Sequence, residues 1–204
     1  MPGPVTQLYM RMVAAPAATS REPDRASPAA LRPASVQEVY EAHFEFVWRS
    51  ARRLGMRPPQ LEDVVQEVFM VVQRRLPEFE GRSSLRTWLF SITRHVVRAH
   101  FRQRARRPLA LGDEARDAPD PAAACPETQL MTREDAELLH ALLAELSQDQ
   151  REVFVLAQLE ELSGPEIAQA LDLPLRSVYG RIFAAQRAFE KALRRARARE
   201  GRRP

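Results

Sequence analysis

The chain has 204 residues, which allows one or two small domains with tails and excludes a large single core with long accessory segments. A single cysteine, Cys125, excludes an internal disulfide and a cysteine-based zinc site, and the four histidines show no ligand-like arrangement with carboxylates. We therefore expect no metal and no cofactor. No apolar run approaches the roughly 18 residues that a membrane span needs, and the first residues lack a charged and then apolar leader. We expect a cytoplasmic protein without membrane insertion.

The basic residues are unevenly distributed along the chain. The formal net charge is only +4, although the pI is about 9.9. Residues 82–107 hold eight arginines and no acid, and residues 181–203 hold nine basic residues against two glutamates. Two separated basic blocks indicate two contacts with a polyanion. The alternative is that both blocks are solvated helix faces.

Composition divides the chain into segments. Residues 1–35 are rich in Pro and Ala and predict a disordered tail. Residues 36–107 and 133–199 carry helical periodicity, residues 108–132 hold five acids and four prolines, and residues 200–204 form a basic tail. Strand and hairpin patterns are missing from the sequence. We therefore predict an all-α fold with two small helical domains joined by a flexible acidic linker.

The first domain begins with two predicted helices. One spans about 36–54 and ends at Gly55 and Pro58-Pro59, and the next spans about 61–76 and ends at Pro77. The second helix places valines and leucines on one face. Three polar residues, spaced i, i+3 and i+4, share the opposite face; they are Asp63, Gln66 and Glu67.

A loop over residues 78–84 leads to a third helix over about 85–104, which is basic but contains aromatic residues. Arginines interleaved with aromatic rings suit single-stranded DNA, because phosphates meet charge and bases stack on rings. We expect Trp88 to pack in the core. Residues in the preceding loop are better placed to touch an extruded base, namely Phe79, Ser83 and Ser84.

The second domain contains a predicted helix-turn-helix. Ser163 and Glu166 form a capping box at the start of a short helix, and Asp172-Leu173-Pro174 breaks it. A second helix follows, with an inner apolar stripe and an outer basic face. Such a pair of helices would place the second one in a DNA major groove, although any helical hairpin could give this pattern. The stripe is Val178, Ile182, Ala185 and Phe189, and the other face includes Arg176, Ser177, Gly180, Arg181, Ala184, Arg187 and Lys191.

These motifs, in this order, resemble the extracytoplasmic-function (ECF) group of the sigma-70 family of RNA polymerase sigma factors, over roughly residues 36–195. The Asp-x-x-Gln-x-x-Phe core of region 2 is matched from Asp63 to Phe69, followed by Thr87-Trp88-Leu89 and by Ile92-Thr93-Arg94. Region 4 is matched at Leu146 to Phe154, at Glu166-Ile167-Ala168, and at Ser177-Val178 with Arg181. Nothing resembles a region 3 domain between them.

The resemblance implies a function and its residues. Such a factor binds core RNA polymerase, through the clamp helices of the largest subunit and the flap, and directs promoter-specific initiation without being an enzyme. An anti-sigma factor is a further partner of many such proteins, and the acidic linker would thread toward the polymerase cleft. The implied core-binding residues are Asp63, Gln66, Glu67 and Phe69. The implied minus-ten residues are Phe79, Arg82, Ser83, Ser84, Arg86, Arg94, His95, Arg98 and Arg102. The implied minus-thirty-five residues are Arg176, Ser177, Tyr179, Gly180, Arg181 and Arg187.

Some positions depart from the family pattern. His95 stands where Asn is common and Ala99 where Asp is common, which puts the usual minus-ten contacts in doubt. The recognition helix has Tyr179, Ala184 and Gln186 where basic residues are frequent, so we expect an unusual minus-thirty-five preference.

Two other functions stay open from the residues alone. A one-component helix-turn-helix regulator would bind a duplex operator without polymerase, but it would not explain the Asp63–Gln66–Glu67 face. A helical adaptor could use its basic faces to bind an acidic protein. Promoter-directed transcription in a reconstituted assay separates the three.

Overall fold

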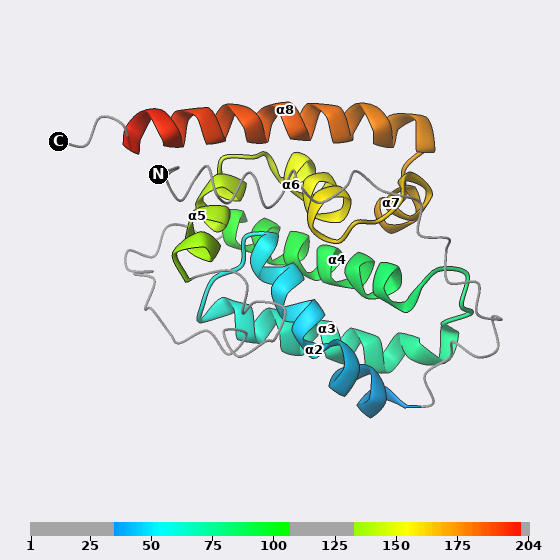
Figure 1. The fold of residues 1–204 in the computed structure, drawn as a ribbon. Helices are drawn as coiled ribbons and strands as arrows, with labels where there is room; N and C mark the ends of the chain where they lie inside the picture. Colours follow the sequence, from blue (N-terminus) through cyan, green and yellow to red (C-terminus); the bar gives the residue numbers. More distant parts are fainter. Residues whose placement is uncertain (1–34, 107–132, 201–204) are drawn as a thin grey trace. The chain divides into compact units, whose positions relative to one another are not determined.

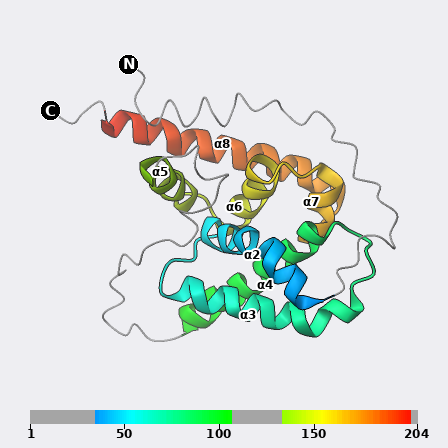
Figure 2. The same ribbon diagram turned by 60° about the horizontal axis from the view of Figure 1, so that its bottom comes forward.

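The computed structural model describes residues 35–106 and 133–200, and the chain divides into two units that hold one of these segments each. Every regular element in these segments is helical (Figures 1 and 2). Residues 1–34, 107–132 and 201–204 lie outside the described residues. The predicted acidic linker (108–132) falls there, as do the predicted tail (1–35) except for Ser35 and the predicted basic end (200–204) except for Glu200. No helix within the described segments is long and apolar enough to cross a membrane. The same segments hold no group of His, Cys, Asp and Glu suited to a metal ion.

The first unit is a bundle of α2 (Val36–Arg53), α3 (Gln60–Arg75) and α4 (Leu85–Arg106), each of which contacts the other two. Helix α2 begins at Ser35, whose hydroxyl accepts a 3.2 Å hydrogen bond from the backbone N–H of Glu38. The apolar faces of the helices meet in a core that excludes water. Its most buried members are Val39, Val47, Ala51, Leu54, Leu61, Val64, Val68, Val72, Leu89, Phe90 and Val97.

The connection from α3 to α4 is also ordered. A short 3-10 turn, Leu76–Glu78, follows α3 and places Pro77 where a helix would otherwise continue. Helix α4 then starts at Ser84, whose hydroxyl accepts a 3.1 Å hydrogen bond from the backbone N–H of Thr87. Ser84 therefore has a structural role as a helix cap.

The second unit contains α5 (Arg133–Ala144), α6 (Gln148–Phe154), a π-helical turn (Val155–Leu159), α7 (Gly164–Leu171) and α8 (Leu175–Glu200). The long helix α8 contacts α5, α6 and α7 (Figure 1). A stacked pair of aromatic rings, Phe154 and Phe189, joins α6 to α8 with centroids 4.3 Å apart. The surrounding core contains Leu139, Leu142, Leu143, Val153, Leu156, Ile167, Leu171, Val178, Ala185 and Leu193.

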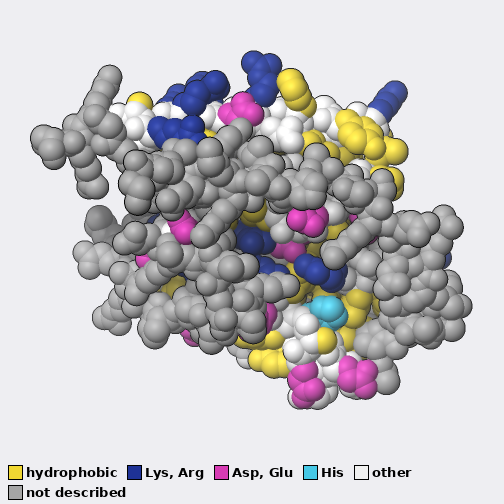
Figure 3. All heavy atoms as spheres, in the orientation of Figure 1, with side chains coloured by type: hydrophobic (Ala, Val, Ile, Leu, Met, Phe, Trp, Pro, Cys, Tyr) yellow, Lys and Arg dark blue, Asp and Glu magenta, His cyan; other side chains and the backbone are white. Residues whose placement is uncertain are grey.

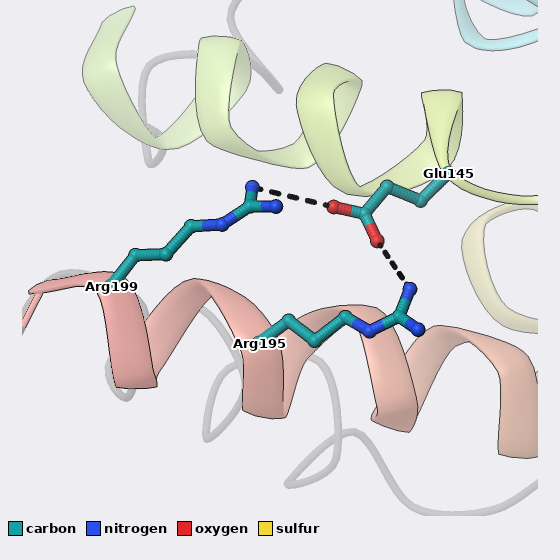
Figure 4. A network of polar contacts seen from close by, with 3 residues as sticks. All are labelled: Glu145, Arg195 and Arg199. Atoms are coloured by element: carbon teal, nitrogen blue, oxygen red, sulfur yellow. Dashed lines mark ion pairs between the residues drawn. The ribbon is translucent and has the colours of Figure 1, made fainter.

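Polar contacts fix how α5 joins its neighbours. The guanidinium of Arg151 donates a 2.7 Å hydrogen bond to the backbone oxygen of Leu143, which satisfies a carbonyl at the end of α5. Glu145 then lies between two arginines of α8 (Figure 4). Its carboxylate oxygens are 3.5 Å from Arg195 and 3.8 Å from Arg199. Because these ion pairs are partly exposed, they contribute little to the free energy of unfolding, and their main role is to orient the helices.

Candidate nucleic-acid and polymerase interface

The helix-turn-helix is formed by α7, a three-residue turn and α8. Glu166 closes the predicted capping box, because its carboxylate accepts a 2.8 Å hydrogen bond from the Ser163 backbone N–H. Asp172 ends α7 in the left-handed region at φ 54°, and its N–H reaches carbonyls of the last turn. Pro174 precedes α8, which buries Val178 against the core. The geometry of a helix pair with a tight turn is thus present.

The opposite side of α8 is exposed and combines arginines with aromatic rings. We call it the outer face of α8. It contains Arg176, Gly180, Phe183 and Arg187, which are spaced at i, i+4, i+7 and i+11, and Tyr179 beside them. Tyr179 and Phe183 are 58% and 61% exposed, unusually high for aromatic side chains. In the space-filling view, dark blue basic and yellow apolar side chains both stand along the upper edge, where α8 lies (Figure 3).

Sequence reasoning included Tyr179 but missed Phe183. Arg181, predicted with this group, is exposed but lies on the flank of the helix, and Ser177 is half-buried. Phe183 could have been found from its position, because it falls opposite the inner stripe that contains Val178 and Phe189. Its ring lies beside Arg187, with the guanidinium carbon 5.7 Å from the ring centroid.

The exposed face of α3 carries the three polar residues that the sequence singled out. Asp63, Gln66 and Glu67 are exposed. Met70 lies one turn further on the same face and is 55% exposed. We call these four residues the α3 face. Sequence reasoning missed Met70, although its i+3 and i+4 spacing from Glu67 and Gln66 would have placed it there.

Phe69, in contrast, is a correction to the predicted docking residues. It is 8% exposed and packs among aromatic rings of α2, with its centroid 4.8 Å from that of Tyr40 and 6.3 Å from that of Phe44. The ring lies at the edge of the apolar face of α3, where it closes the contact with α2. Phe69 therefore supports the bundle, and Met70 is the apolar side chain available on the exposed face.

A second correction concerns the loop before α4. We expected Phe79 to be better placed than Trp88 to touch a base, and the burial of the two rings reverses this order. Phe79 is 5% exposed and packs against Trp88, with centroids 5.0 Å apart, whereas Trp88 is half-buried. Ser83 is half-buried and Ser84 is exposed, with the capping role described above.

The basic side of α4 presents its residues unequally. Arg94 and Arg98 are half-buried, while His95 and Arg102 are exposed. The ring of His95 is turned toward its own helix, since its Nδ1 lies 2.6 Å from the backbone oxygen of Ser91 and donates to it. This side of the helix can meet a phosphate backbone through charge.

Arg82 and Arg86 flank the start of α4 and contact protein groups. Arg82 is ion-paired with Glu80 in the exposed loop. The Arg86 guanidinium carbon lies 4.8 Å from the centroid of the Phe46 ring in α2. Nearby, burial and then the charge of Arg86 lower the pKa of His43 from its ordinary value of 6.5. Protonation of His43 is therefore unfavourable in the folded unit.

Taken together, the two helical units define a class of protein: a helical factor with a helix-turn-helix in one unit and a basic, aromatic-bearing helix in the other. The sequence matches the family model described as Sigma-70 region 2 over residues 39–107 and the one described as Sigma-70, region 4 over residues 136–189.

Curated relatives agree with these matches. The chain is 33% identical over 141 residues to the RNA polymerase sigma-H factor of Pseudomonas aeruginosa, covering 66% of this chain and 73% of that protein. It is 30% identical over 135 residues to the ECF RNA polymerase sigma-E factor of Escherichia coli K12, covering 63% and 71%. It is 30% identical over 155 residues to the ECF sigma factor SigC of Mycobacterium tuberculosis, covering 76% and 81%. The chain belongs to the sigma-70 family, in its ECF group.

Solved structures support the same fold. CnrH, in complex with the cytosolic domain of CnrY, is 25% identical, with a TM-score of 0.58 and coverage of 81% of this chain and 94% of that chain. The sigma factor RpoE of Bartonella quintana, in complex with the anti-sigma factor NepR, is 21% identical, with a TM-score of 0.57 and coverage of 78% and 96%. The second likeness concerns the fold alone.

Proposed function

We propose that this sigma factor binds core RNA polymerase through the α3 face and divides promoter recognition between its two units. The observation that carries the proposal is the α3 face itself: Asp63, Gln66 and Glu67 are exposed together on a helix whose other side is fully apolar. Exposed acidic and amide groups around a methionine suit a protein partner, because polar groups give register and an exposed apolar side chain gives buried area.

The first unit, residues 36–107, is proposed to hold the unwound minus-ten strand. The exposed side of α4 offers Arg102 and His95 to phosphates, and the half-buried Trp88 offers an aromatic ring for stacking. The residues proposed from the resemblance keep this role, except that Phe79 acts through Trp88. The second unit, residues 133–199, is proposed to read the minus-thirty-five element as duplex.

The proposal includes partners and a place of action. The factor contributes specificity and is not an enzyme, since initiation chemistry belongs to the polymerase. It acts in the cytoplasm, where promoter DNA lies. CnrH is bound to the cytosolic domain of CnrY, and we extend the proposal to an anti-sigma factor as a further partner of this chain.

Reconstituted transcription tests the proposed function. Core RNA polymerase with the full chain should initiate from a defined subset of a genomic promoter library, and neither component alone should do so. The α3-face variant with Asp63→Ala and Gln66→Ala should lose this activity while keeping its helical content. Sequence-specific duplex binding by the free chain, with no change on adding core polymerase, would overturn the proposal in favour of a one-component regulator.

A further inference from the structure

The outer face of α8 carries two aromatic rings where base edges would be met. Tyr179 and Phe183 are among the most exposed large apolar side chains of the described residues, and they are one helical turn apart. The core of the unit is already closed behind them by Val178 and Ala185, which are fully buried. Neither ring is therefore needed to close the apolar core of the unit.

The charge around these rings points to duplex DNA as their partner. Residues 175–189 contain Arg176, Arg181 and Arg187 and no acid, so the helix is complementary to phosphates. An acidic protein could also meet the arginines, but it would not require rings at the centre of the face. In the major groove, the C5-methyl of thymine is the apolar group that base pairs present.

We propose that Tyr179 and Phe183 read thymine methyl groups in the minus-thirty-five element, and that Gly164 holds the Tyr179 ring in the reading position. This inference rests on the proposed function of the second unit. It identifies the readout as apolar contact, in addition to pairing of arginine with guanine. Four residues of helix advance about 6 Å, and neighbouring base pairs are about 3.4 Å apart. The two rings then meet base pairs about two steps apart.

Gly164 provides the positioning. A Cβ placed on Gly164 would lie 2.8 Å from the Tyr179 hydroxyl oxygen and 2.9 Å from the ring carbon that bears it. The Tyr179 ring thus lies against the backbone at the start of α7 with no room for a side chain between them. The hydroxyl end is directed at α7, which leaves the rest of the 58% exposed side chain for an apolar contact. Gly164→Ala would displace the ring, an exposed side chain that can move without disturbing the core.

The experiment uses holoenzyme formed from the full chain and core RNA polymerase. Duplexes randomised across both promoter elements are selected for binding, and the enriched sequence is then made with deoxyuridine in place of each upstream thymidine in turn. Deoxyuridine keeps base pairing and removes only the methyl. We expect two positions, about two steps apart, at which the native holoenzyme loses about fourfold in affinity, the value for one buried methyl.

Variants assign each methyl to a ring. Phe183→Ala should abolish the loss of affinity caused by deoxyuridine at one of the two positions, and Tyr179→Ala should abolish it at the other. Tyr179→Phe should keep the loss of affinity at the Tyr179 position. Gly164→Ala should reduce the loss only at the Tyr179 position, and should add nothing in the Tyr179→Ala background. Thermal unfolding of each variant controls for the fold.

The outcomes separate this inference from the proposed function. If holoenzyme enriches no upstream sequence, the proposed function of the second unit fails. If it enriches a sequence that lacks thymine, or one whose thymines tolerate deoxyuridine, the methyl readout is wrong and the proposed function stands. The Phe183→Ala holoenzyme could instead lose affinity equally for all promoters and keep the native sensitivity to deoxyuridine. That result would make Phe183 a contact for a protein and would overturn the inference.

Discussion

The Phe79 ring packs against Trp88, with their centroids 5.0 Å apart and their planes at 47°. Phe79 belongs to the loop before α4 and is buried, while Trp88 belongs to the first turns of α4 and is half-buried. The buried ring of Phe79 in the loop therefore supports the partly exposed ring of Trp88. A contact with an extruded base would be made by Trp88, with Phe79 as its backing.

Phe79→Ala should destabilise the first unit by about 3 kcal/mol, since a buried ring is replaced by a cavity. It should also shift the tryptophan emission, because Trp88 loses its support. Urea unfolding followed by fluorescence measures both quantities. Glu80→Ala in the same exposed loop is the control and should change stability by less than about 0.5 kcal/mol. Equal stability of the Phe79 variant and the control would contradict the support role.

Met70→Ala should weaken binding to core RNA polymerase about tenfold, as expected for an apolar anchor at the centre of an interface. Fluorescence titration of labelled full-length chain with core enzyme measures the affinity. Glu41→Ala, on the exposed side of α2, is the matched control in the same unit. Unchanged affinity of the Met70 variant, or an equal loss in the control, would remove the α3 face from the interface.

Arg102→Ala should weaken open-complex formation at all promoters and lower its dependence on salt, because a phosphate contact carries no sequence information. Arg102 is chosen over Arg98 since Arg98 is half-buried and already has a partner within the protein. A promoter premelted across the minus-ten region should rescue the variant only in part. Full rescue would show that Arg102 acts in melting and not in strand capture.

Arg176→Ala should cost about 1–3 kcal/mol at promoters with the preferred base and should relax preference at one minus-thirty-five position. Transcription profiling of this variant beside Arg102→Ala separates the two surfaces. The Arg176 variant should change the ranking of promoters, while the Arg102 variant should lower all of them. Identical profiles would refute the division of labour between the two units.

The free energy of unfolding should decrease as the pH is lowered, and part of this decrease should come from His43. Its pKa is lower in the folded chain than the ordinary 6.5, so the unfolded chain binds the extra proton more readily. Titration of His43 therefore leaves the free energy of unfolding unchanged above about pH 7 and lowers it as the pH falls below 6.5. Urea unfolding between about pH 7.5 and pH 5 should show a shallower fall for His43→Gln than for the native chain. Parallel curves would exclude His43 as a source of the slope.

The first two helices of the first unit were predictable because each has apolar residues at helical spacing and a clear stop. The helix predicted over 61–76 is observed as Gln60–Arg75, and its polar face is exposed as expected. The roles of Phe69 and Phe79 were not predictable. Phe69 lies at the edge of a stripe, where burial depends on the neighbouring helix, and Phe79 lies in a loop, where periodicity carries no information.

In the second unit, the capping box and the turn at Asp172 were readable because their chemistry is local. The π-helical turn over Val155–Leu159 was not, since its residues continue an ordinary helical pattern. The close approach of Tyr179 to Gly164 was equally hidden, because it depends on how α7 and α8 cross. Local motifs were thus predictable, and contacts between elements were not.

The pairing of Glu145 with Arg195 and Arg199 has a consequence for engineering chimeric sigma factors. A graft that carries only α7 and α8 would separate these arginines from their carboxylate. A graft that began at α6 would also leave Arg151 without the end of α5 that it caps. The smallest transplantable cassette therefore starts at the beginning of α5, at Arg133, and runs through Glu200. Exchange at that junction moves promoter preference together with the contacts that hold the recognition helix in place.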